Sequence, residues 1–359
     1  MCGNEHFLYD TAAELRILRV TPPPLSPALV VLLPGPDVRV LGMSARVRNE
    51  RVAARAGAIV VSPGSLAEDG EGAAVRVPSD RLIDLGLFPL ALSAALLDVS
   101  TAASRRRAAW HILRRTAKAT DGWVSSHLNR PISCVVSFAL LSLGLSASHA
   151  SWLTLAVGLG AAALAAQPGY AALVSAGVLF QLASVLDGVD GEMARATLTE
   201  SESGARLDAL VDQITYVACL VGVTVGWIRG GGGPGAIVWT SVVAVALVMS
   251  LIRGGRFVSR HAPNASFVFI DRSVRRAARD SGRVGLRIAA GAFALLRRDV
   301  FAMVFLAVAL TGHRAFVPAL VACGIVLANA TLTWYRRDLA DAALAERYGE
   351  NRAVMSRES

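Results

Sequence analysis

Long runs of apolar residues fill most of the chain beyond residue 148, and each run predicts a membrane-spanning helix. A helix needs about 20 mostly apolar residues to cross the hydrocarbon core of a bilayer. Polar or glycine-rich breaks divide this region into six candidate spans: 149–167, 169–187, 208–228, 234–252, 299–312 and 316–335. The pattern therefore predicts a mainly α, polytopic membrane protein built on a bundle of six transmembrane helices.

The loops between the candidate spans differ in charge. Segments 188–207 and 253–298 belong to one side of the membrane, and the second is dense in arginine, whereas the loops of the other side carry only Arg229 and Arg314. Because basic loops stay on the cytoplasmic side, this asymmetry predicts that both termini are cytoplasmic. We expect a multi-pass protein of a bacterial-type inner membrane.

The first hundred residues have a different pattern. Short apolar runs typical of buried strands occur at 28–34, 58–63 and 73–78. Helical spacing separates the first two runs and ends on Gly57, and a second helix is expected over 79–97. Residues 1–100 are therefore predicted to form a small α/β cytoplasmic domain.

A linker over 101–147 is expected between this domain and the membrane domain, 148–340, with a cytoplasmic tail at 341–359. Within it, 104–130 reads as an amphipathic juxtamembrane helix in which arginines meet lipid phosphates. The apolar residues expected on the bilayer are Trp110, Ile112, Leu113 and Trp123. A solvated helix between domains is the alternative, and the apolar stretch that follows is short enough to be interfacial.

Composition agrees with a membrane protein. The chain of 359 residues is 54% hydrophobic and 18% charged, with a mean hydropathy of +0.50, which excludes an ordinary soluble domain. The net charge of +9 fits an anionic membrane surface better than nucleic acid, because the basic runs lack interleaved aromatic residues. The four cysteines are scattered without a disulfide or zinc pattern.

Four aspartates lie beside two of the apolar runs. Asp187 and Asp190 are three residues apart, and Asp208 and Asp212 are four apart, so each pair lies on one face of a helix. If the two helices form an antiparallel hairpin, the pairs converge at its cytoplasmic end. Four such carboxylates need cations, and an oxygen-only ligand set favours Mg²⁺ or Mn²⁺, with two ions expected.

The alternatives to a metal-dependent enzyme are acids that merely mark a loop, or a cation-binding membrane transporter that uses the acidic cluster as an ion site. Acids near a membrane are costly, so four together argue against the first alternative. The transporter would require polar residues deep in several spans, whereas these acids stay at one edge.

The order Asp187-x₂-Asp190-Gly191-x₂-Ala194-Arg195-x₈-Gly204-x₃-Asp208-x₃-Asp212 resembles the complete signature of the CDP-alcohol phosphotransferases. The resemblance implies a six-helix membrane enzyme of phospholipid or polar phosphodiester synthesis. Such an enzyme moves a phosphoalcohol from a CDP-alcohol to an acceptor hydroxyl and releases CMP. It also implies that all four aspartates hold metal, that Asp212 takes the proton of the acceptor, and that the chain forms a homodimer. The residues implied to line the CDP site are Gly191, Ala194, Arg195 and Gly204.

One departure from the family pattern precedes the first span, where Ala147-Ser148 and then Ser151 replace a Pro-Asn pair and a following Thr. An acceptor that carries a phosphate, such as inositol phosphate, would need cations beside the aspartates. The candidates are Arg130, His127, Arg256 and Arg260. Topology or lipid headgroups offer another explanation for these arginines. CDP-diacylglycerol is the alternative to a soluble CDP-alcohol as donor.

The N-terminal region resembles the nucleotidyltransferase domain that is fused to some members of the family, and DGWVSSHLNRPIS resembles their linker. The glycine-rich nucleotide loop of such domains is replaced here by PGPDVRV. Without those backbone amides, phosphate binding has no basis. We therefore expect a degenerate, non-catalytic domain.

Overall fold

The computed structural model describes residues 29–56, 58–61, 74–84, 96–117, 122–261, 268–295 and 297–342. The chain divides into two compact units, Met1–Ile112 and Leu113–Ser359, each described by itself. Most of the predicted tail at 341–359 lies outside the described residues. The predicted domain limits stay predictions.

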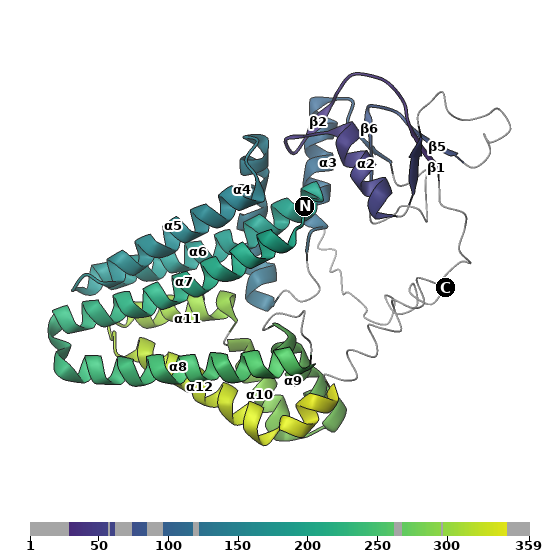
Figure 1. Ribbon diagram of the computed structural model, residues 1–359. Helices are drawn as coiled ribbons and strands as arrows, with labels where there is room; N and C mark the ends of the chain where they lie inside the picture. Colours follow the sequence, from purple (N-terminus) through teal and green to yellow (C-terminus); the bar gives the residue numbers. More distant parts are fainter. Residues whose placement is uncertain are drawn as a thin grey trace, which may run out of the picture. The chain divides into compact units, whose positions relative to one another are not determined.

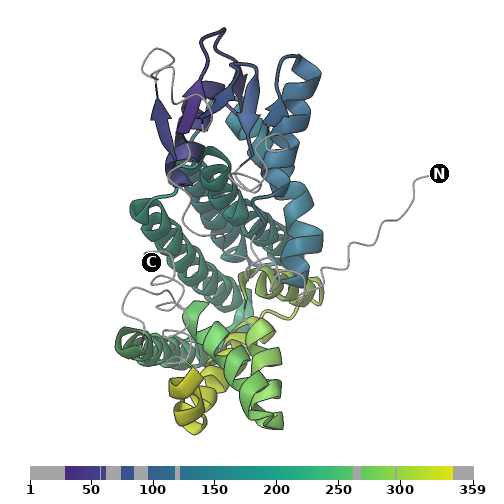
Figure 2. The same cartoon turned by 90° about the vertical axis from the view of Figure 1, so that its right-hand side faces the viewer.

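The first unit contains a parallel sheet in the order β4-β1-β5, formed by β1 (Leu29–Leu32), β4 (Ile59–Val61) and β5 (Ala74–Val77). Helix α2 (Ala45–Arg55) connects β1 to β4, and Figure 2 shows these strands, in purple, side by side. Val30, Val31 and Val52 are buried between strand and helix. The predicted order of strand, helix and strand is confirmed, because each apolar run is β-branched and bounded by turn residues.

The helix predicted over 79–97 is wrong at both ends. Residues Arg81–Ile83 form β6, which pairs antiparallel with β7 (Leu96–Asp98). The side chain of Asn49 donates to the carbonyl oxygen of Arg81 at 2.8 Å and accepts from the amide of Ile83 at 2.8 Å. These long-range hydrogen bonds satisfy the backbone in an extended conformation, which local helical spacing did not reveal.

Buried polar groups tie α2 to this hairpin. Arg48 of α2 donates to the carbonyl oxygen of Ile83 at 3.0 Å. Asp84, which follows β6, lies 2.8 Å from His111 of the helix Ala102–Arg114. Burial lowers the pKa of the Arg48 guanidinium to about 10, and the neighbouring charge of Asp84 opposes this effect. Arg48 thus remains charged at neutral pH, with Asp84 as its counter-charge.

The predicted amphipathic helix at 104–130 is not one continuous helix. Helix α3 (Ala102–Arg114) is followed, beyond residues outside the described ranges, by a π-helical turn η2 (Ser125–Asn129) and by α4 (Arg130–Ser142). Ile112 and Leu113 are buried, which contradicts the bilayer contact expected of them, whereas Trp123 is 73% exposed. With 13 residues, α4 is too short to span a bilayer, as expected.

The second unit is helical (Figure 1). Its remaining helices are α5 (Ala147–Ala165), α6 (Tyr170–Thr197), α7 (Glu202–Trp227), η3 (Ile228–Gly232), α8 (Gly233–His261), α9 (Val268–Ser281), α10 (Val284–Leu295), α11 (Arg298–Leu310) and α12 (Phe316–Trp334). Gly231, with a φ of 92°, lies between α7 and α8, where the chain reverses direction.

Among the described residues, four helical segments are long and apolar enough to cross a membrane: Ala147–Ala165, Tyr170–Thr197, Glu202–Phe257 and Phe316–Trp334. The third contains α7 and most of α8, and therefore covers two predicted spans. The predicted fifth span corresponds to α11, which has only 13 residues. A polytopic membrane protein is therefore supported, whereas the count of six spans stays a prediction.

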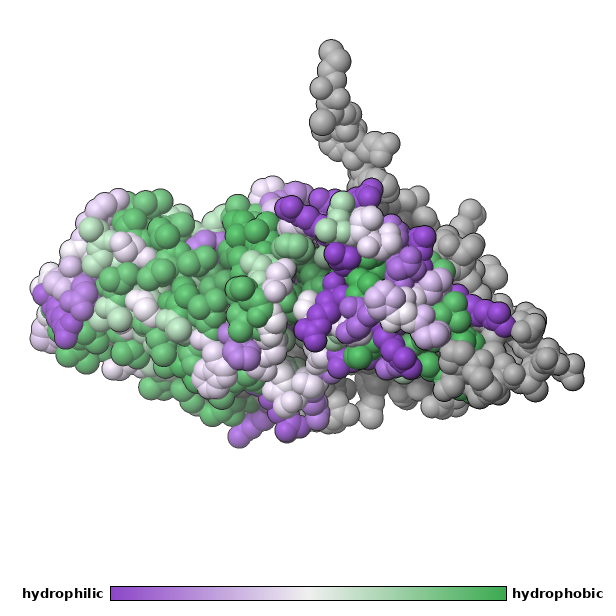
Figure 3. Space-filling view, turned by 90° about the horizontal axis from the view of Figure 1, so that it is seen from above, coloured by the Kyte–Doolittle hydropathy of each residue, from purple (hydrophilic) through white to green (hydrophobic). Residues whose placement is uncertain are grey.

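The long helices bury small and aromatic residues inside and expose large apolar ones outside. Helix α5 packs against α6 and α7, and α11 packs against α6. Hydrophobic side chains cover the helical unit along its length in Figure 3. The exposed ones include Trp152, Val178, Val217, Val221, Ile237, Val238, Val242, Val245 and Val248. Such a surface is expected to face lipid rather than water.

A separate hydrophobic cluster joins α8, α9, α10 and α12. Val274, Ala277 and Leu286 lie at its centre, with Phe257 and Leu339 beside them. Helix α9 presents its arginines away from this cluster, so this arginine-rich part of the chain is a packed amphipathic helix.

Candidate functional site

Two helix ends position the four aspartates. Helix α6 continues through Asp187 and Asp190 as far as Thr197, and Leu198 ends it in the left-handed conformation with a φ of 54°. Helix α7 begins after Ser201, whose hydroxyl accepts from the amide of Gly204 at 3.1 Å and caps the helix. Both carboxylate pairs therefore stand on helical backbone near one tight connection, as the spacing predicted.

The structure brings three of the four acids together. Asp187, Asp208 and Asp212 each place a carboxylate oxygen within 4.8 Å of those of the other two, and each is half-buried. Oxygen atoms so arranged can bind one cation jointly.

Asp190 lies apart from this group of three. Its side chain is 7% exposed and accepts from the hydroxyl of Ser151 on α5 at 2.5 Å and from the amide of Gly191 at 2.5 Å. Ser151 is one of the positions at which the chain departs from the family pattern. This contact ties the aspartate motif on α6 to the start of α5.

An arginine that the sequence did not single out lies among the acids. Arg298, in the first turn of α11, places its Nη1 atom 2.6 Å from Oδ1 of Asp187 and forms an ion pair with Asp212. Its side chain is only 11% exposed, and its Cζ atom lies 5.9 Å from the centre of the Tyr216 ring. A single guanidinium thus pairs with two of the three carboxylates.

A layer of aromatic side chains supports the acids from within the bundle. Phe180 of α6 makes edge-to-face contacts with Tyr216 of α7 and with Phe301 and Phe305 of α11, at ring-centre distances of 5.5 to 6.2 Å. Tyr216 follows Asp212 by one helical turn, and Phe301 follows Arg298 by about one turn. This packing fixes the three helices that carry the charged groups.

Glu192 is a second residue that the sequence did not single out. It is 1% exposed and accepts from the hydroxyls of Ser133 at 2.6 Å and Ser137 at 2.9 Å. Arg130 lies 3.6 Å from it and also donates to the carbonyl oxygen of Thr116 at 2.8 Å. Glu192 therefore attaches α4 to the helix that carries Asp187.

The predicted CDP-binding residues lie on the same two helices. The Nε atom of Arg195 donates to the carbonyl oxygen of Thr116 at 2.9 Å, and a side chain at Gly191 would lie 2.9 Å from Nη1 of Arg195. Ala194 is half-buried, and Gly204 is in the first turn of α7. Their nucleotide contacts stay predictions.

The candidate acceptor residues do not form one group around the acids. Arg130 is the partner of Glu192, and His127 stacks on Trp123 with ring centres 5.1 Å apart. Arg256 and Arg260 are exposed on α8. Their proposed phosphate contacts stay predictions.

No local signal in the sequence identified Arg298 or Glu192, because arginines are frequent throughout 253–298 and Glu192 adjoins other acids. Ser133 and Ser137 occur four residues apart before an apolar run, a spacing that places both on one helix face. This pair of serines could have indicated that a polar side chain of another helix packs against α4.

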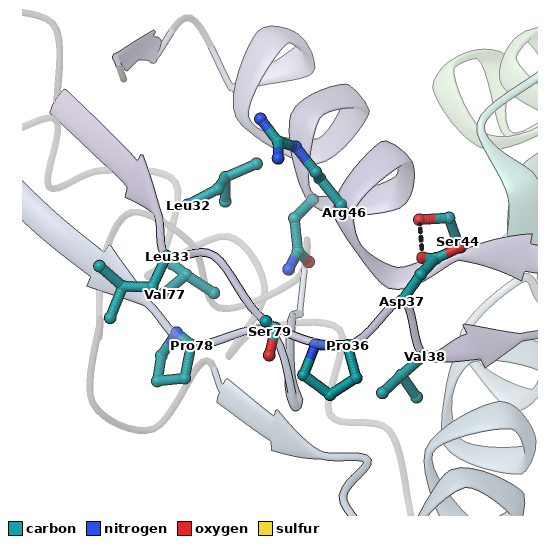
Figure 4. Close-up of a pocket in the computed structure, with 12 residues that line it drawn as sticks. Leu32, Leu33, Pro36, Asp37, Val38, Ser44, Arg46, Val77, Pro78 and Ser79 are labelled. Carbon is teal, nitrogen blue, oxygen red and sulfur yellow. Dashed lines mark hydrogen bonds between the residues drawn. The ribbon is translucent and has the colours of Figure 1, made fainter. Parts of the chain in front are cut away.

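The first unit has a cavity of about 340 Å³ at the carboxyl ends of β1 and β5 (Figure 4). Its lining includes Pro36, Asp37, Ser44 and Arg46, and the hydroxyl of Ser44 donates to Asp37. Open α/β sheets bind ligands at this edge. Here the lining carries both the carboxylate of Asp37 and the guanidinium of Arg46.

The acid cluster fits a divalent metal. Its donors are carboxylate oxygens from three residues, the ligand type that Mg²⁺ and Mn²⁺ prefer. The negative charge of the three carboxylates exceeds the single positive charge of the arginine beside them. Asp187, Asp208 and Asp212 would be the ligands.

The family comparison agrees with this geometry. The model of the CDP-alcohol phosphatidyltransferase family matches residues 130–311, which is half of the chain and contains all four aspartates and Arg298. The chain belongs to this family. It is therefore a member of a membrane-associated family of transferases that act on CDP-alcohols.

Three similar proteins carry the name bifunctional IPC transferase and DIPP synthase. The protein of Thermococcus kodakarensis is 37% identical over 132 residues, covering 36% of this chain and 29% of the relative. That of Rubrobacter xylanophilus is 37% identical over 170 residues, covering 45% and 37%, and that of Archaeoglobus fulgidus is 30% identical over 141 residues, covering 38% and 28%. The matches thus span little more than a third of each relative at most.

Proposed function

We propose that this chain is a metal-dependent membrane enzyme that transfers a phosphoalcohol from a CDP-alcohol to an acceptor hydroxyl and releases CMP. The observation that carries the proposal is the convergence of Asp187, Asp208 and Asp212 within a family match. The acceptor is a polar phosphoalcohol such as inositol phosphate, because DGWVSSHLNRPIS resembles the linker of the fused family members. Phospholipid synthesis from CDP-diacylglycerol is the second possibility that the substrate test must separate.

The acids have distinct roles in this proposal. All four aspartates hold Mg²⁺ or Mn²⁺, and we expect two ions. The convergence of Asp187, Asp208 and Asp212 supports a site that these three carboxylates share. A bound divalent ion supplies positive charge to the pyrophosphate oxygens of the donor. Gly191, Ala194, Arg195 and Gly204 face the CDP moiety.

Asp212 acts as the general base. Its carboxylate accepts the proton of the acceptor hydroxyl while the hydroxyl oxygen bonds to the phosphorus that carries the alcohol. The bond from that phosphorus to the bridging oxygen breaks, and CMP leaves with this oxygen. The aromatic layer under Tyr216 keeps the acid in place during transfer.

The proposal also covers membrane topology, oligomeric state and the N-terminal domain. Six spans, cytoplasmic termini, an inner-membrane location and a homodimer are expected of the enzyme. Residues 1–100 form a non-catalytic domain, because PGPDVRV stands where the glycine-rich nucleotide loop of such domains is expected. Cytidylyl transfer from CTP by the full chain would overturn it.

The test uses purified protein in detergent with Mn²⁺, a set of CDP-linked donors and a set of acceptors. Mass spectrometry detects CMP and identifies the product. We expect CMP release together with one phosphodiester product. Cation flux into liposomes that contain the protein, without CMP from any donor, would instead support the transporter.

A further inference from the structure

Arg298 is held by the acids that the proposed function assigns to metal. Its Nη1 atom contacts both Asp187, at 2.6 Å, and Asp212. Its Nε and Nη2 atoms are buried and have no hydrogen-bond partner among the described residues. The polar contacts of this guanidinium therefore come from two carboxylates of the cluster.

The guanidinium and a metal ion would bind the same carboxylates. Oδ1 of Asp187 and Oδ1 of Asp212 both face Arg298, and a divalent ion shared by these acids needs direct bonds to their carboxylates. Two cations at one set of ligands also repel each other. Arg298 and a metal ion therefore compete for this site.

The backbone at the start of α11 is anchored, so the side chain is the part that can move. Asp299, 7% exposed, accepts from the amide of Ser125 at 2.9 Å and lies 3.5 Å from Nε of Arg297. The Tyr216 ring, 5.9 Å from Cζ of Arg298, flanks the guanidinium. The fold thus keeps Arg298 beside the acids while leaving its side-chain torsions as the means of withdrawal.

We propose that Arg298 is an internal counter-cation: it holds Asp187 and Asp212 together before metal binds, and the incoming divalent ion displaces it. This inference rests on the proposed function, because it takes the cluster to be a metal site. Arg298 is then a positioning residue that acts through the carboxylates. Its loss exposes the three acids to mutual repulsion without metal and removes a competitor when metal is present.

The test measures Mn²⁺ affinity and melting temperature on the full-length protein in detergent. Electron paramagnetic resonance measures the concentration of free Mn²⁺ while the protein is titrated with Mn²⁺. The proteins compared are wild type, Arg298→Gln, Arg298→Lys and the control Arg297→Gln. The control removes Arg297, the neighbouring arginine, whose Nε atom lies 3.5 Å from Asp299. It therefore corrects for the long-range effect of one lost charge.

We expect Arg298→Gln to bind Mn²⁺ about tenfold more tightly than wild type. In this variant the charged hydrogen bonds from the guanidinium to the carboxylates no longer compete with the metal. Its melting temperature falls in EDTA and returns to the wild-type value with saturating Mn²⁺. Arg298→Lys lies between these values, and Arg297→Gln binds Mn²⁺ like wild type.

Equal Mn²⁺ affinity in wild type and Arg298→Gln, or weaker binding in the variant, would overturn the inference while leaving the metal site intact. An equal effect of Arg297→Gln would also overturn it. Absence of Mn²⁺ binding in every variant would instead contradict the proposed function. The two failures are thus distinguishable without an activity assay.

Discussion

Glu192 tests how α6, the helix that carries Asp187 and Asp190, is attached to α4. Replacing it by alanine removes a carboxylate that is 1% exposed and that accepts hydrogen bonds from Ser133 and Ser137. Arg130, whose side chain is 13% exposed, loses the carboxylate at 3.6 Å. The substitution therefore leaves buried polar groups of α4 without their acceptor on α6.

The size of the effect follows from this burial. Removing one partner of a buried ion pair costs about 3–5 kcal/mol, whereas an exposed pair contributes less than about 1 kcal/mol. We expect Glu192→Ala to lower the free energy of unfolding by about 3 kcal/mol or more. Ser133→Ala and Ser137→Ala each lose a single charge-assisted hydrogen bond and should cost about 1–3 kcal/mol.

The assay is reversible unfolding by SDS in mixed micelles, followed by circular dichroism. The matched control is Glu202→Ala, because Glu202 pairs with Arg206 across side chains that are 86% and 77% exposed. This control should unfold within about 0.5 kcal/mol of wild type. If Glu192→Ala also unfolded like wild type, the attachment of α4 to α6 through this carboxylate would be refuted.

Three further predictions concern packing, helix ends and metal. Gly222→Ala should cost about 1–3 kcal/mol in the same unfolding assay, because the added methyl group meets the carbonyl oxygen of Ala162, whereas Gly230→Ala, which faces open space, should cost less. Arg314→Gln should cost about 1–3 kcal/mol, because Arg314 donates to three carbonyl oxygens at and beyond the end of α5, and an unchanged unfolding curve would contradict this contact. EDTA should abolish CMP release and added Mn²⁺ or Mg²⁺ should restore it, whereas full activity in EDTA would exclude the metal role.

The spacing of the aspartates predicted the convergence of three of them, because the relation between positions three or four apart on a helix is local, whereas Asp190 contacts Ser151 instead. Asp187, Asp208 and Asp212 meet as expected once α6 and α7 form. The parallel strands β1 and β4 were likewise visible as β-branched runs bounded by turns.

Contacts between distant segments were not predictable in this way. Arg298 reaches Asp212 only because α11 packs against α6, and that packing depends on Phe180 and Phe305. The hairpin of β6 and β7 replaced an expected helix because Asn49 and a distant strand satisfy its backbone. In both cases tertiary interactions, which a single local pattern does not contain, decide the outcome.

The central claim is that the acid cluster is the catalytic centre of phosphoalcohol transfer. The most direct measurement is the single-turnover rate of CMP release by Asp212→Asn, with Mn²⁺ saturating and with Glu202→Gln as the control for an exposed acid. We predict that Asp212→Asn is slowed by about 100-fold or more, the range expected for loss of a general base, and that the control matches wild type. Release of CMP by Asp212→Asn at the wild-type rate would contradict the account.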